Sequence, residues 1–272
     1  MSDADDYPLG YSAAEAQRLA DQSDYVEQLT EDLFRRAGLH GGMQVLDLGS
    51  GVGDVALLAA RMVGSEVTVL GIEKAASSVE MARRRAAELG VHNVTFEESD
   101  LADFETDQTF DAIVGRFVLL YVPERIKVLR RLARHCRPGA IFALQELDIS
   151  QISEEPPSEL FLQVRGWIHA AFAAAGADLH MGTRLYATFR QAGLPPPDML
   201  SVTPVGGGAA FPGYEQMVQV LRSLLPLVER NGIANSADIG IDTLVERLRE
   251  DAIAHDRVIF LSRIVSAWAR LP

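Results

Sequence analysis

The residues whose types and spacing most clearly suggest ligand binding lie in one segment, Val45-Leu46-Asp47-Leu48-Gly49-Ser50-Gly51-Val52-Gly53-Asp54. Its apolar start predicts a short strand, and the glycines that follow let the backbone turn tightly and approach a ligand closely. The helix expected from Asp54 onward begins with amide N–H groups that have no partner inside the helix. Because Asp47 precedes the glycines, the loop would repel a pyrophosphate but suits a ligand that carries an ammonium group. The predicted ligand-binding residues of this loop are Asp47, Gly49, Ser50, Gly51 and Gly53.

Two more acids follow the next two predicted strands. Glu73 comes about twenty residues after the glycine loop, where a carboxylate can accept hydrogen bonds from both hydroxyls of a ribose. Asp100 follows the third strand, where it can accept from an adenine amino group while Leu101 packs on the ring. Either acid alone has a simpler explanation, a helix cap for Glu73 and a turn for Asp100. Together they predict an adenosine-binding row at successive strand ends, and Lys74 is included in it.

Side chains after the fourth and fifth predicted strands are candidates for contact with a second substrate. Arg116 could pair with a carboxylate of the cofactor or substrate, or with a neighbouring loop acid. Phe117 and Tyr121 either contact the substrate or pack in the core. Glu146 ends the fifth strand and shares a strand face with Asp148, so it could act as a base, bind a cationic acceptor, or only face water.

Two further pairs of residues, which lie outside the predicted sheet, are candidates for contact with the substrate. Arg165 and His169 are four residues apart on one predicted helix. An unperturbed histidine suits a general base, although an exposed surface histidine is the simpler interpretation. Tyr7 and Tyr11 precede the first helix and are expected to close over the site, with Tyr11 a candidate catalytic residue. No cluster of His, Cys and Asp has metal-ligand spacing, so no metal is predicted.

Strands and helices alternate through the first 150 residues, which predicts an α/β fold with a parallel sheet and helices on both faces. A capping box at Ser12-Ala13-Ala14-Glu15 opens a first helix that runs to Gly38. The strands are expected at 44–48, 66–72, 94–97, 110–114 and 141–147, and the helices between them at 54–62, 77–89 and 124–135.

After Asp148 the alternation gives way mainly to helices, which are expected to form a lid over the site. These helices are expected at 158–176, 184–191, 213–230 and 241–254, with strands near 199–205 and over Val258–Trp268. The predicted organisation is an N-terminal helical cap (1–40), a Rossmann-like cofactor-binding core (41–150) and a C-terminal half of the sheet with helical lid insertions (151–272), all in one structural domain.

Composition narrows the class of protein. The chain has 272 residues, 48% of them hydrophobic, which suits one large α/β domain. Its formal net charge of −13 argues against nucleic acid as a main partner, because phosphate binding needs clustered Lys and Arg. With Cys136 as the single cysteine, no internal disulfide can form, and a reducing cytoplasm is expected. No signal peptide and no membrane span is predicted, and the oligomeric state is not indicated.

Five motifs together resemble the class I S-adenosylmethionine-dependent methyltransferases, and within them the small-molecule group similar to the ubiquinone and menaquinone-biosynthesis methyltransferases. The motifs are VLDLGSGVGD, GIEKA, ESDLADF, FDAIVGRFVLLYVPE and CRPGAIFALQELD. The resemblance covers residues 7–150 and the closing strand. It implies a seven-stranded sheet whose last strand is antiparallel, with S-adenosylmethionine across the carboxyl ends of the first strands.

The activity that this resemblance implies is methyl transfer from S-adenosylmethionine to a small organic acceptor, at an oxygen, nitrogen or carbon atom that the sequence does not specify. An NAD-dependent oxidoreductase is one alternative, but its Gly-x-Gly-x-x-Gly pattern is absent because residue 54 is Asp. A non-catalytic regulator with the same fold and a protein methyltransferase with an open cleft are the others. The long segments 151–195 and 206–255 favour a closed pocket for a small molecule.

Overall fold

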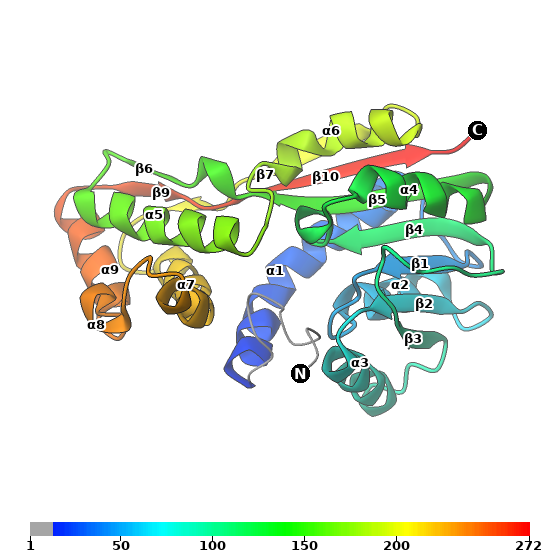
Figure 1. The fold of residues 1–272 in the computed structure, drawn as a ribbon, viewed down its shortest axis with the longest axis horizontal. Helices are drawn as coiled ribbons and strands as arrows, with labels where there is room; N and C mark the ends of the chain where they lie inside the picture. The colour runs from blue at the N-terminus through cyan, green and yellow to red at the C-terminus, as the bar shows by residue number, and fades with distance from the viewer. Residues whose placement is uncertain (1–12) are drawn as a thin grey trace.

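A seven-stranded sheet forms the centre of the computed structural model, which describes residues 13–272, with side chains from residue 25 onward. The strand order is β3-β2-β1-β4-β5-β10-β7 (Figure 1). Strands β1 to β5 run parallel, and β10 lies antiparallel between β5 and β7. The predicted seven-stranded, mostly parallel sheet with an antiparallel last strand is therefore confirmed. Its strands are β1 (Val45–Leu48), β2 (Val69–Glu73), β3 (Val94–Glu98), β4 (Phe110–Arg116), β5 (Cys136–Asp148), β7 (Asp198–Val202) and β10 (Arg263–Arg270).

Helices cover both faces of this sheet because successive strand residues point to opposite sides. Val45 packs with apolar residues of α1, α2 and α3, whereas Leu46 packs with those of α4 and α6. Strands that are buried on both faces contain continuous apolar runs, as β5 does at residues 140–144. The helices of the first face are α1 (Ala13–Ala37), α2 (Asp54–Val63) and α3 (Ala76–Glu88), and those of the second are α4 (Arg125–Leu132) and α6 (Met181–Ala192).

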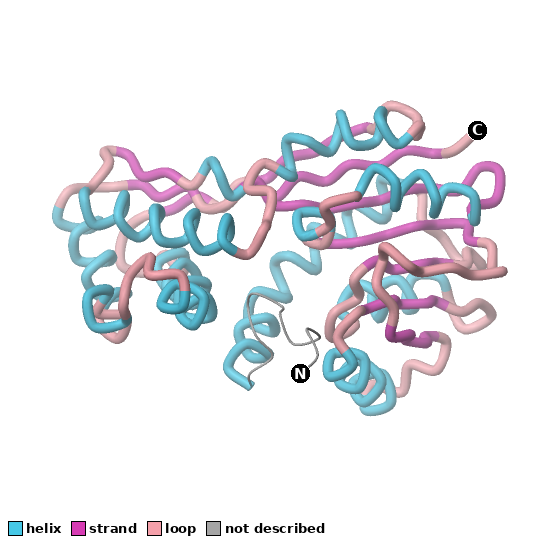
Figure 2. Tube along the Cα trace, in the orientation of Figure 1, coloured by secondary structure: helices cyan, strands magenta, loops and turns pink. Residues whose placement is uncertain are grey.

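The remaining helices and a small antiparallel sheet form a helical lobe at one end of the large sheet, with α1 between this lobe and α2 and α3 (Figures 1 and 2). Within the lobe, α7 packs against both α5 and α9. The lobe comprises α5 (Glu159–Ala174), α7 (Gly213–Arg230), α8 (Ser236–Ile239) and α9 (Leu244–Ala254), with β6 (Ser153–Glu155), β8 (Val205–Gly206) and β9 (Val258–Phe260) in the order β6-β9-β8.

The strand expected over Val258–Trp268 is in fact two strands. β9 pairs with β6 and β8 in the small sheet, and β10 pairs with β5 and β7 in the large one. Leu261 and Ser262 lie between them, and the N–H of Leu261 donates to the carbonyl oxygen of Pro204 at 3.0 Å. Because each half finds its partners far away in the chain, local hydrophobicity does not reveal the break. β6 is not expected from the sequence either, since its residues are polar.

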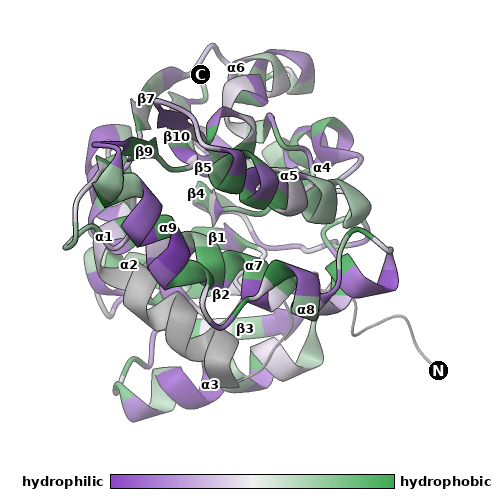
Figure 3. Cartoon of the chain, turned by 90° about the vertical axis from the view of Figure 1, so that its left-hand side faces the viewer, coloured by the Kyte–Doolittle hydropathy of each residue, from purple (hydrophilic) through white to green (hydrophobic). Residues whose placement is uncertain are grey.

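Hydropathy follows this layering. In Figure 3 the strands are mainly hydrophobic, whereas the helices around them mix hydrophobic and hydrophilic residues, as amphipathic helices do. Short 3-10 turns follow β4 and β5 or extend α4: η2 (Leu119–Tyr121), η4 (Ile149–Gln151) and η3 (Ala133–His135). No helix in the described part of the chain is both long and apolar enough to cross a membrane.

Candidate functional site

The glycine loop between β1 and α2 leaves room for a ligand. Gly49, Gly51 and Gly53 have φ angles of 59°, 52° and 93°, a region in which residues with a side chain are strained. A Cβ atom added to Gly51 would meet no atom within 4 Å, so open space lies beside this residue. A Cβ atom added to Gly49 would overlap the side chain of Val118. The loop therefore touches the turn after β4 at Gly49 and is open at Gly51.

Glu73 ends β2 directly beside this loop. Its Oε2 accepts the N–H of Gly51 at 3.0 Å, and its Oε1 accepts the N–H of Ala75 at 3.0 Å. Each carboxylate oxygen can accept a further hydrogen bond, so Glu73 can still accept from two ribose hydroxyls. Lys74, the next residue, is exposed. The structure thus places the candidate ribose acid in direct contact with the glycine loop.

Asp100 and Leu101 follow β3, the neighbour of β2 in the sheet. The N–H of Ser99 donates to the carbonyl oxygen of Glu73 at 2.9 Å, which joins the two strand ends. Asp100 is exposed, and its Oδ1 accepts the N–H of Ala102 at 2.8 Å, a turn contact typical of aspartate. Leu101 is buried in the core. The ends of β1, β2 and β3 therefore meet at one edge of the sheet.

Asp47 lies in β1 beneath the loop and is fully buried. Neither of its carboxylate oxygens has a well-formed hydrogen bond among the described residues. Burial raises the pKa of the Asp47 carboxyl well above its usual value, while the charge of Arg116 and the nearby Ala56 amide lower it. A cationic group bound near the loop would favour the ionised form of this carboxyl, in keeping with the ammonium group that the sequence suggests.

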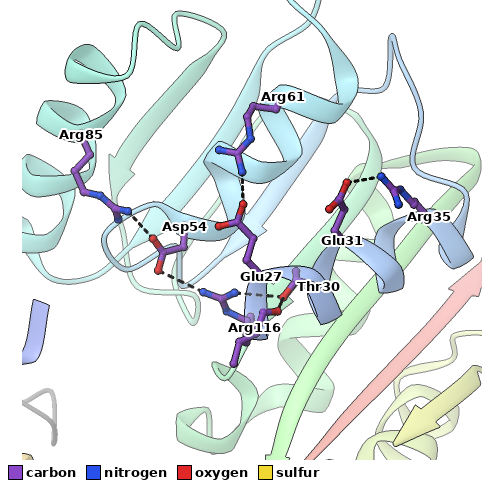
Figure 4. Close-up of polar contacts among 9 residues, drawn as sticks. Glu27, Thr30, Glu31, Arg35, Asp54, Arg61, Arg85 and Arg116 are labelled. Atoms are coloured by element: carbon purple, nitrogen blue, oxygen red, sulfur yellow. Dashed lines mark hydrogen bonds and ion pairs between the residues drawn. The ribbon is translucent and has the colours of Figure 1, made fainter. Parts of the chain in front are cut away.

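Arg116 lies at the end of β4 in a polar network that joins α2 to α1 (Figure 4). Its Nη2 lies 3.4 Å from Asp54 Oδ2, and its Nη1 donates to Thr30 Oγ1 at 3.3 Å. Asp54 also pairs with Arg85 at 2.7 Å, and the Thr30 hydroxyl donates to Gln145 Oε1 at 2.9 Å. The pair with Asp54 is the loop-acid alternative for Arg116, and it fixes the guanidinium at the start of α2.

A cavity of about 170 Å³ lies beyond the ends of β4 and β5, with walls from α1, α5 and α7. Phe117 and Tyr121, both predicted to contact substrate, line it. Leu147 of β5, Ile168 of α5 and Val220 of α7 supply apolar surface. The cavity is therefore assembled from both halves of the chain.

One turn borders both the cavity and the glycine loop. Val118 lies against Gly49, while Phe117 and Leu120 line the cavity. Phe117 has a φ of 57°, which is rare for a residue with a bulky side chain. The guanidinium carbon of Arg116 lies 5.9 Å from the centre of the Phe117 ring. Ligands at the loop and in the cavity would therefore be neighbours across this turn.

The structure does not bring Glu146 to the cavity wall. Its carboxylate is fully buried, and its Oε1 accepts the N–H groups of Val118 at 3.0 Å and Leu119 at 2.7 Å. Strand alternation explains this arrangement: Leu147 faces the cavity, so Glu146 and Asp148 point away from it. The expected contact of Glu146 with an acceptor is replaced by support of the turn after β4.

Arg165 and His169 lie on α5 and contact the backbone after β5. Arg165 Nη1 donates to the carbonyl oxygen of Ile152 at 3.4 Å, and His169 Nε2 lies 2.9 Å from that of Ile149. Burial lowers the pKa of His169. The side chains of Ile149 and Ile152 line the cavity, whereas Arg165 and His169 do not. These two residues therefore contact the backbone of two lining residues without facing the cavity themselves.

Some residues of the site were not anticipated from the sequence, and two that were cannot be placed. Tyr7 and Tyr11 lie outside the described residues. The amphipathic pattern of 213–230 indicates an apolar face but not what this face covers, and the Leu261–Ser262 break is hidden inside an apolar run. The unanticipated lining residues include Tyr25, Val26, Pro204, Gln216, Met217, Val220 and Ser262.

Among the described residues, no group of three or more His, Cys, Asp or Glu is arranged to hold a metal ion.

The fold and the site together define a class I S-adenosylmethionine-dependent methyltransferase. The strand order with antiparallel β10, the glycine loop after β1, and acids at the ends of β2 and β3 are the features of this class that the sequence led us to expect. A family described as a methyltransferase domain matches residues 39–193, which is more than half of the chain. The chain belongs to this methyltransferase family.

Proteins with similar sequences are also methyltransferases. Methyltransferase GfsG of Streptomyces halstedii is 29% identical over 218 residues, which cover 77% of this chain and 72% of GfsG. A trans-aconitate 2-methyltransferase of Methylobacterium nodulans is 34% identical over 149 residues, 54% of each chain. A 2-phytyl-1,4-naphtoquinone methyltransferase of Synechococcus elongatus is 36% identical over 108 residues, 39% of this chain and 46% of that enzyme.

Solved structures share the fold at low sequence identity. A putative methyltransferase of Bacillus halodurans has a TM-score of 0.61 at 15% identity, covering 89% of this chain and 98% of that one. The [4+2]-cyclase SpnF has a TM-score of 0.56 at 23% identity, covering 90% and 80%. Since a cyclase carries this fold, the fold alone does not determine the reaction, and the chemistry must be argued from the site.

Proposed function

We propose that this methyltransferase transfers the methyl group of S-adenosylmethionine to a small organic acceptor held in the cavity between α1, α5 and α7. The accepting atom is oxygen, nitrogen or carbon. One observation carries the proposal: the turn Phe117–Tyr121 borders both the glycine loop and the cavity. A displacement reaction needs donor and acceptor about 3 Å apart, so the two sites must be neighbours, and sites that border the same turn satisfy this first requirement.

The residues around the glycine loop fit S-adenosylmethionine. This cofactor supplies a methyl group on a sulfonium, whose loss leaves a neutral thioether, so the protein needs little acid catalysis. Gly51 leaves space for a ligand, and Glu73 has lone pairs for the ribose hydroxyls. Asp100 is exposed for an adenine amino group. The buried carboxyl of Asp47 and the guanidinium of Arg116 lie beside the loop, where they could face the ammonium and carboxylate groups of the cofactor.

Charge and composition support a small acceptor and a cytoplasmic location. The formal net charge of −13 disfavours a polyanionic acceptor such as nucleic acid. The single cysteine suits a reducing compartment.

The cofactor assignment is tested by calorimetric titration of S-adenosylhomocysteine into the wild type and Glu73→Gln. Hydrogen bonds to a charged group are worth about 1.5–3 kcal/mol, so the variant should bind roughly 10- to 100-fold more weakly. Glu88→Gln, which changes an exposed acid at the end of α3, should bind like the wild type. Thermal unfolding without ligand separates lost binding from lost folding.

Three outcomes would contradict the proposal. Binding of NAD without binding of S-adenosylhomocysteine would replace the methyltransferase cofactor with that of an oxidoreductase. Equal affinity of wild type and Glu73→Gln would remove Glu73 from the cofactor site. Tight binding with no turnover on a broad acceptor panel would favour a non-catalytic regulator.

A further inference from the structure

We infer that the acceptor is an uncharged molecule that places a hydrocarbon group of about one ring in the cavity beside the turn Phe117–Tyr121. This inference rests on the proposed function, because it identifies the cavity with the acceptor site. It adds the chemical class of the acceptor, which neither the fold nor the relatives specify.

The described part of the cavity wall carries no charged side chain. None of the described lining residues is Asp, Glu, Lys, Arg or His. Apolar side chains come from each bounding element, among them Phe117, Leu147, Ile168, Met217 and Ile264. A charged group placed against such a wall would lose its hydration without gaining a partner, which is costly. The cavity therefore selects against acceptors that would bury a charge in it.

The charged residues around the cavity are engaged elsewhere. Glu146 accepts backbone amides on the other face of β5, and Arg116 pairs with Asp54. Arg165 and His169 contact carbonyl oxygens behind the wall. None of these four residues lines the cavity, so none is placed there to neutralise a bound charge.

The size of the cavity limits the buried part of the acceptor. An engineered apolar cavity of about 150 Å³ in another protein binds benzene, and this cavity measures about 170 Å³. One ring or a comparable aliphatic group fits it. A larger molecule would have to leave its remainder outside, near Tyr25, whose side chain is 43% exposed.

Neutral polar groups at the wall can orient the acceptor. The amide of Gln216 and the hydroxyls of Tyr25 and Ser262 belong to lining residues. Such groups suit a hydroxyl, ketone or ester oxygen. They donate or accept without carrying a charge at neutral pH, so they add orientation without changing the selection against ions.

Three probes with the same ring test this inference: benzyl alcohol, benzoate and benzylammonium. Each is titrated by ligand-observed NMR into the protein saturated with S-adenosylhomocysteine. Benzyl alcohol should bind at least ten-fold more tightly than both ions. The net charge of −13 would weaken benzoate and strengthen benzylammonium, whereas an uncharged wall weakens both, so the two ions together separate these effects.

Variants of Val220 locate the binding. Val220→Phe should abolish binding of benzyl alcohol by filling the cavity. Val220→Asp should weaken benzyl alcohol and raise the affinity for benzylammonium at least ten-fold, a gain that misfolding cannot produce. Gln219→Asp adds the same charge at a neighbouring α7 residue that does not line the cavity, and it should leave all three affinities unchanged.

The inference is overturned if an ion binds as well as benzyl alcohol, if benzyl alcohol does not bind, or if the Val220 variants behave like Gln219→Asp. Loss of the proposed function would appear separately, as absence of S-adenosylhomocysteine binding in the calorimetric titration. If S-adenosylhomocysteine binds normally but a charged probe binds best, the proposed acceptor class is wrong and the methyltransferase assignment stands.

Discussion

At the scale of single residues, Glu146 is the most perturbed carboxyl whose role the geometry explains. Burial raises its pKa to about 8, while the backbone amides of Leu119 and Val118 and the charge of Arg125 lower it. The side chain accepts two successive amides of the turn that carries Phe117, a residue with positive φ. Glu146 therefore acts as a support for a strained turn that borders the cavity.

This pKa predicts how stability depends on pH. The carboxyl ionises near 4.5 in the unfolded chain and near 8 in the folded one, so between these values the folded chain binds the extra proton. Raising the pH through this window should lower the free energy of unfolding, by roughly 5 kcal/mol at most, and the loss from this group should level off about one unit above pH 8. Glu146→Gln does not titrate and should lack this slope.

Urea unfolding of both proteins at about pH 5 and about pH 8 measures the difference. The buried Asp47 carboxyl contributes a slope of the same sign to both proteins, so it cancels in the comparison. Glu97→Gln, an exposed change on β3, should keep the wild-type pH dependence. Parallel curves for wild type and Glu146→Gln would show that the buried carboxyl keeps an ordinary pKa.

The site residues show how far sequence reaches at this scale. Glu73 and Asp100 could be placed because parallel strands end at one edge of a sheet, whatever their side chains do. The direction of Glu146 could not, because it depends on which face of β5 the cavity occupies, and residues of α7 and β10 determine that. The sequence predicted that Arg116 could pair with a neighbouring acid but not that this acid is Asp54. The two residues come close only because α2 packs against β4.

At the scale of elements, α1 is fixed to the sheet by a buried polar contact as well as by apolar packing. Thr30 is buried, and its hydroxyl lies 2.9 Å from Gln145 Oε1 and 2.8 Å from the carbonyl oxygen of Val26. Gln145 Nε2 in turn donates to Ser266 Oγ of β10 at 3.0 Å. The chain of contacts ties α1 to β5 and β10, and thereby positions Tyr25 and Val26 at the cavity.

Thr30→Val keeps the shape of the side chain and removes its hydroxyl. Gln145 Oε1 would then lose its donor inside the protein, so the free energy of unfolding should fall by about 1–3 kcal/mol. Chemical denaturation measures this loss. Thr95→Val makes the same change at an exposed position of β3 and should be close to neutral. Equal stability of both variants would mean that the contact of α1 with β5 adds nothing to its apolar packing.

Elements of the first half follow from the sequence more closely than those of the second. Each βα unit packs with units nearby in the sequence, and glycine or proline residues mark many of the turns between them. For this reason β1 to β5 and α2 to α4 lie within about five residues of their expected bounds. The small sheet joins three segments far apart in the chain, β6, β8 and β9, through antiparallel pairing that leaves no periodic signal in strands of two or three residues.

At the scale of the whole molecule, apolar packing connects the helical lobe to the sheet. One continuous core contains residues of β1, β4 and β5 together with residues of α5, α7 and α9. The other core, on the opposite face, holds α1, α2 and α3 against the same strands. Because both cores share these strands, we expect the described chain to unfold as one cooperative unit.

The two tryptophans test this expectation, because each reports on a different core. Trp167 of α5 packs against the lobe-side core, and Trp268 of β10 packs against the α1–α3 core. Fluorescence of Trp268 in Trp167→Phe and of Trp167 in Trp268→Phe should each give a urea midpoint that coincides with the circular dichroism midpoint of the same protein. Saturation with S-adenosylhomocysteine at about 100 times its Kd should raise the free energy of unfolding by about 2.7 kcal/mol in both variants. A helical lobe that unfolds by itself would give an earlier Trp167 transition that the ligand does not move, since the proposed cofactor residues belong to β1, β2, β4 and the loops after β1, β2 and β3, outside the lobe. Such a result would divide the chain into two cooperative units and make the cavity wall from α5 and α7 a separable part of the enzyme.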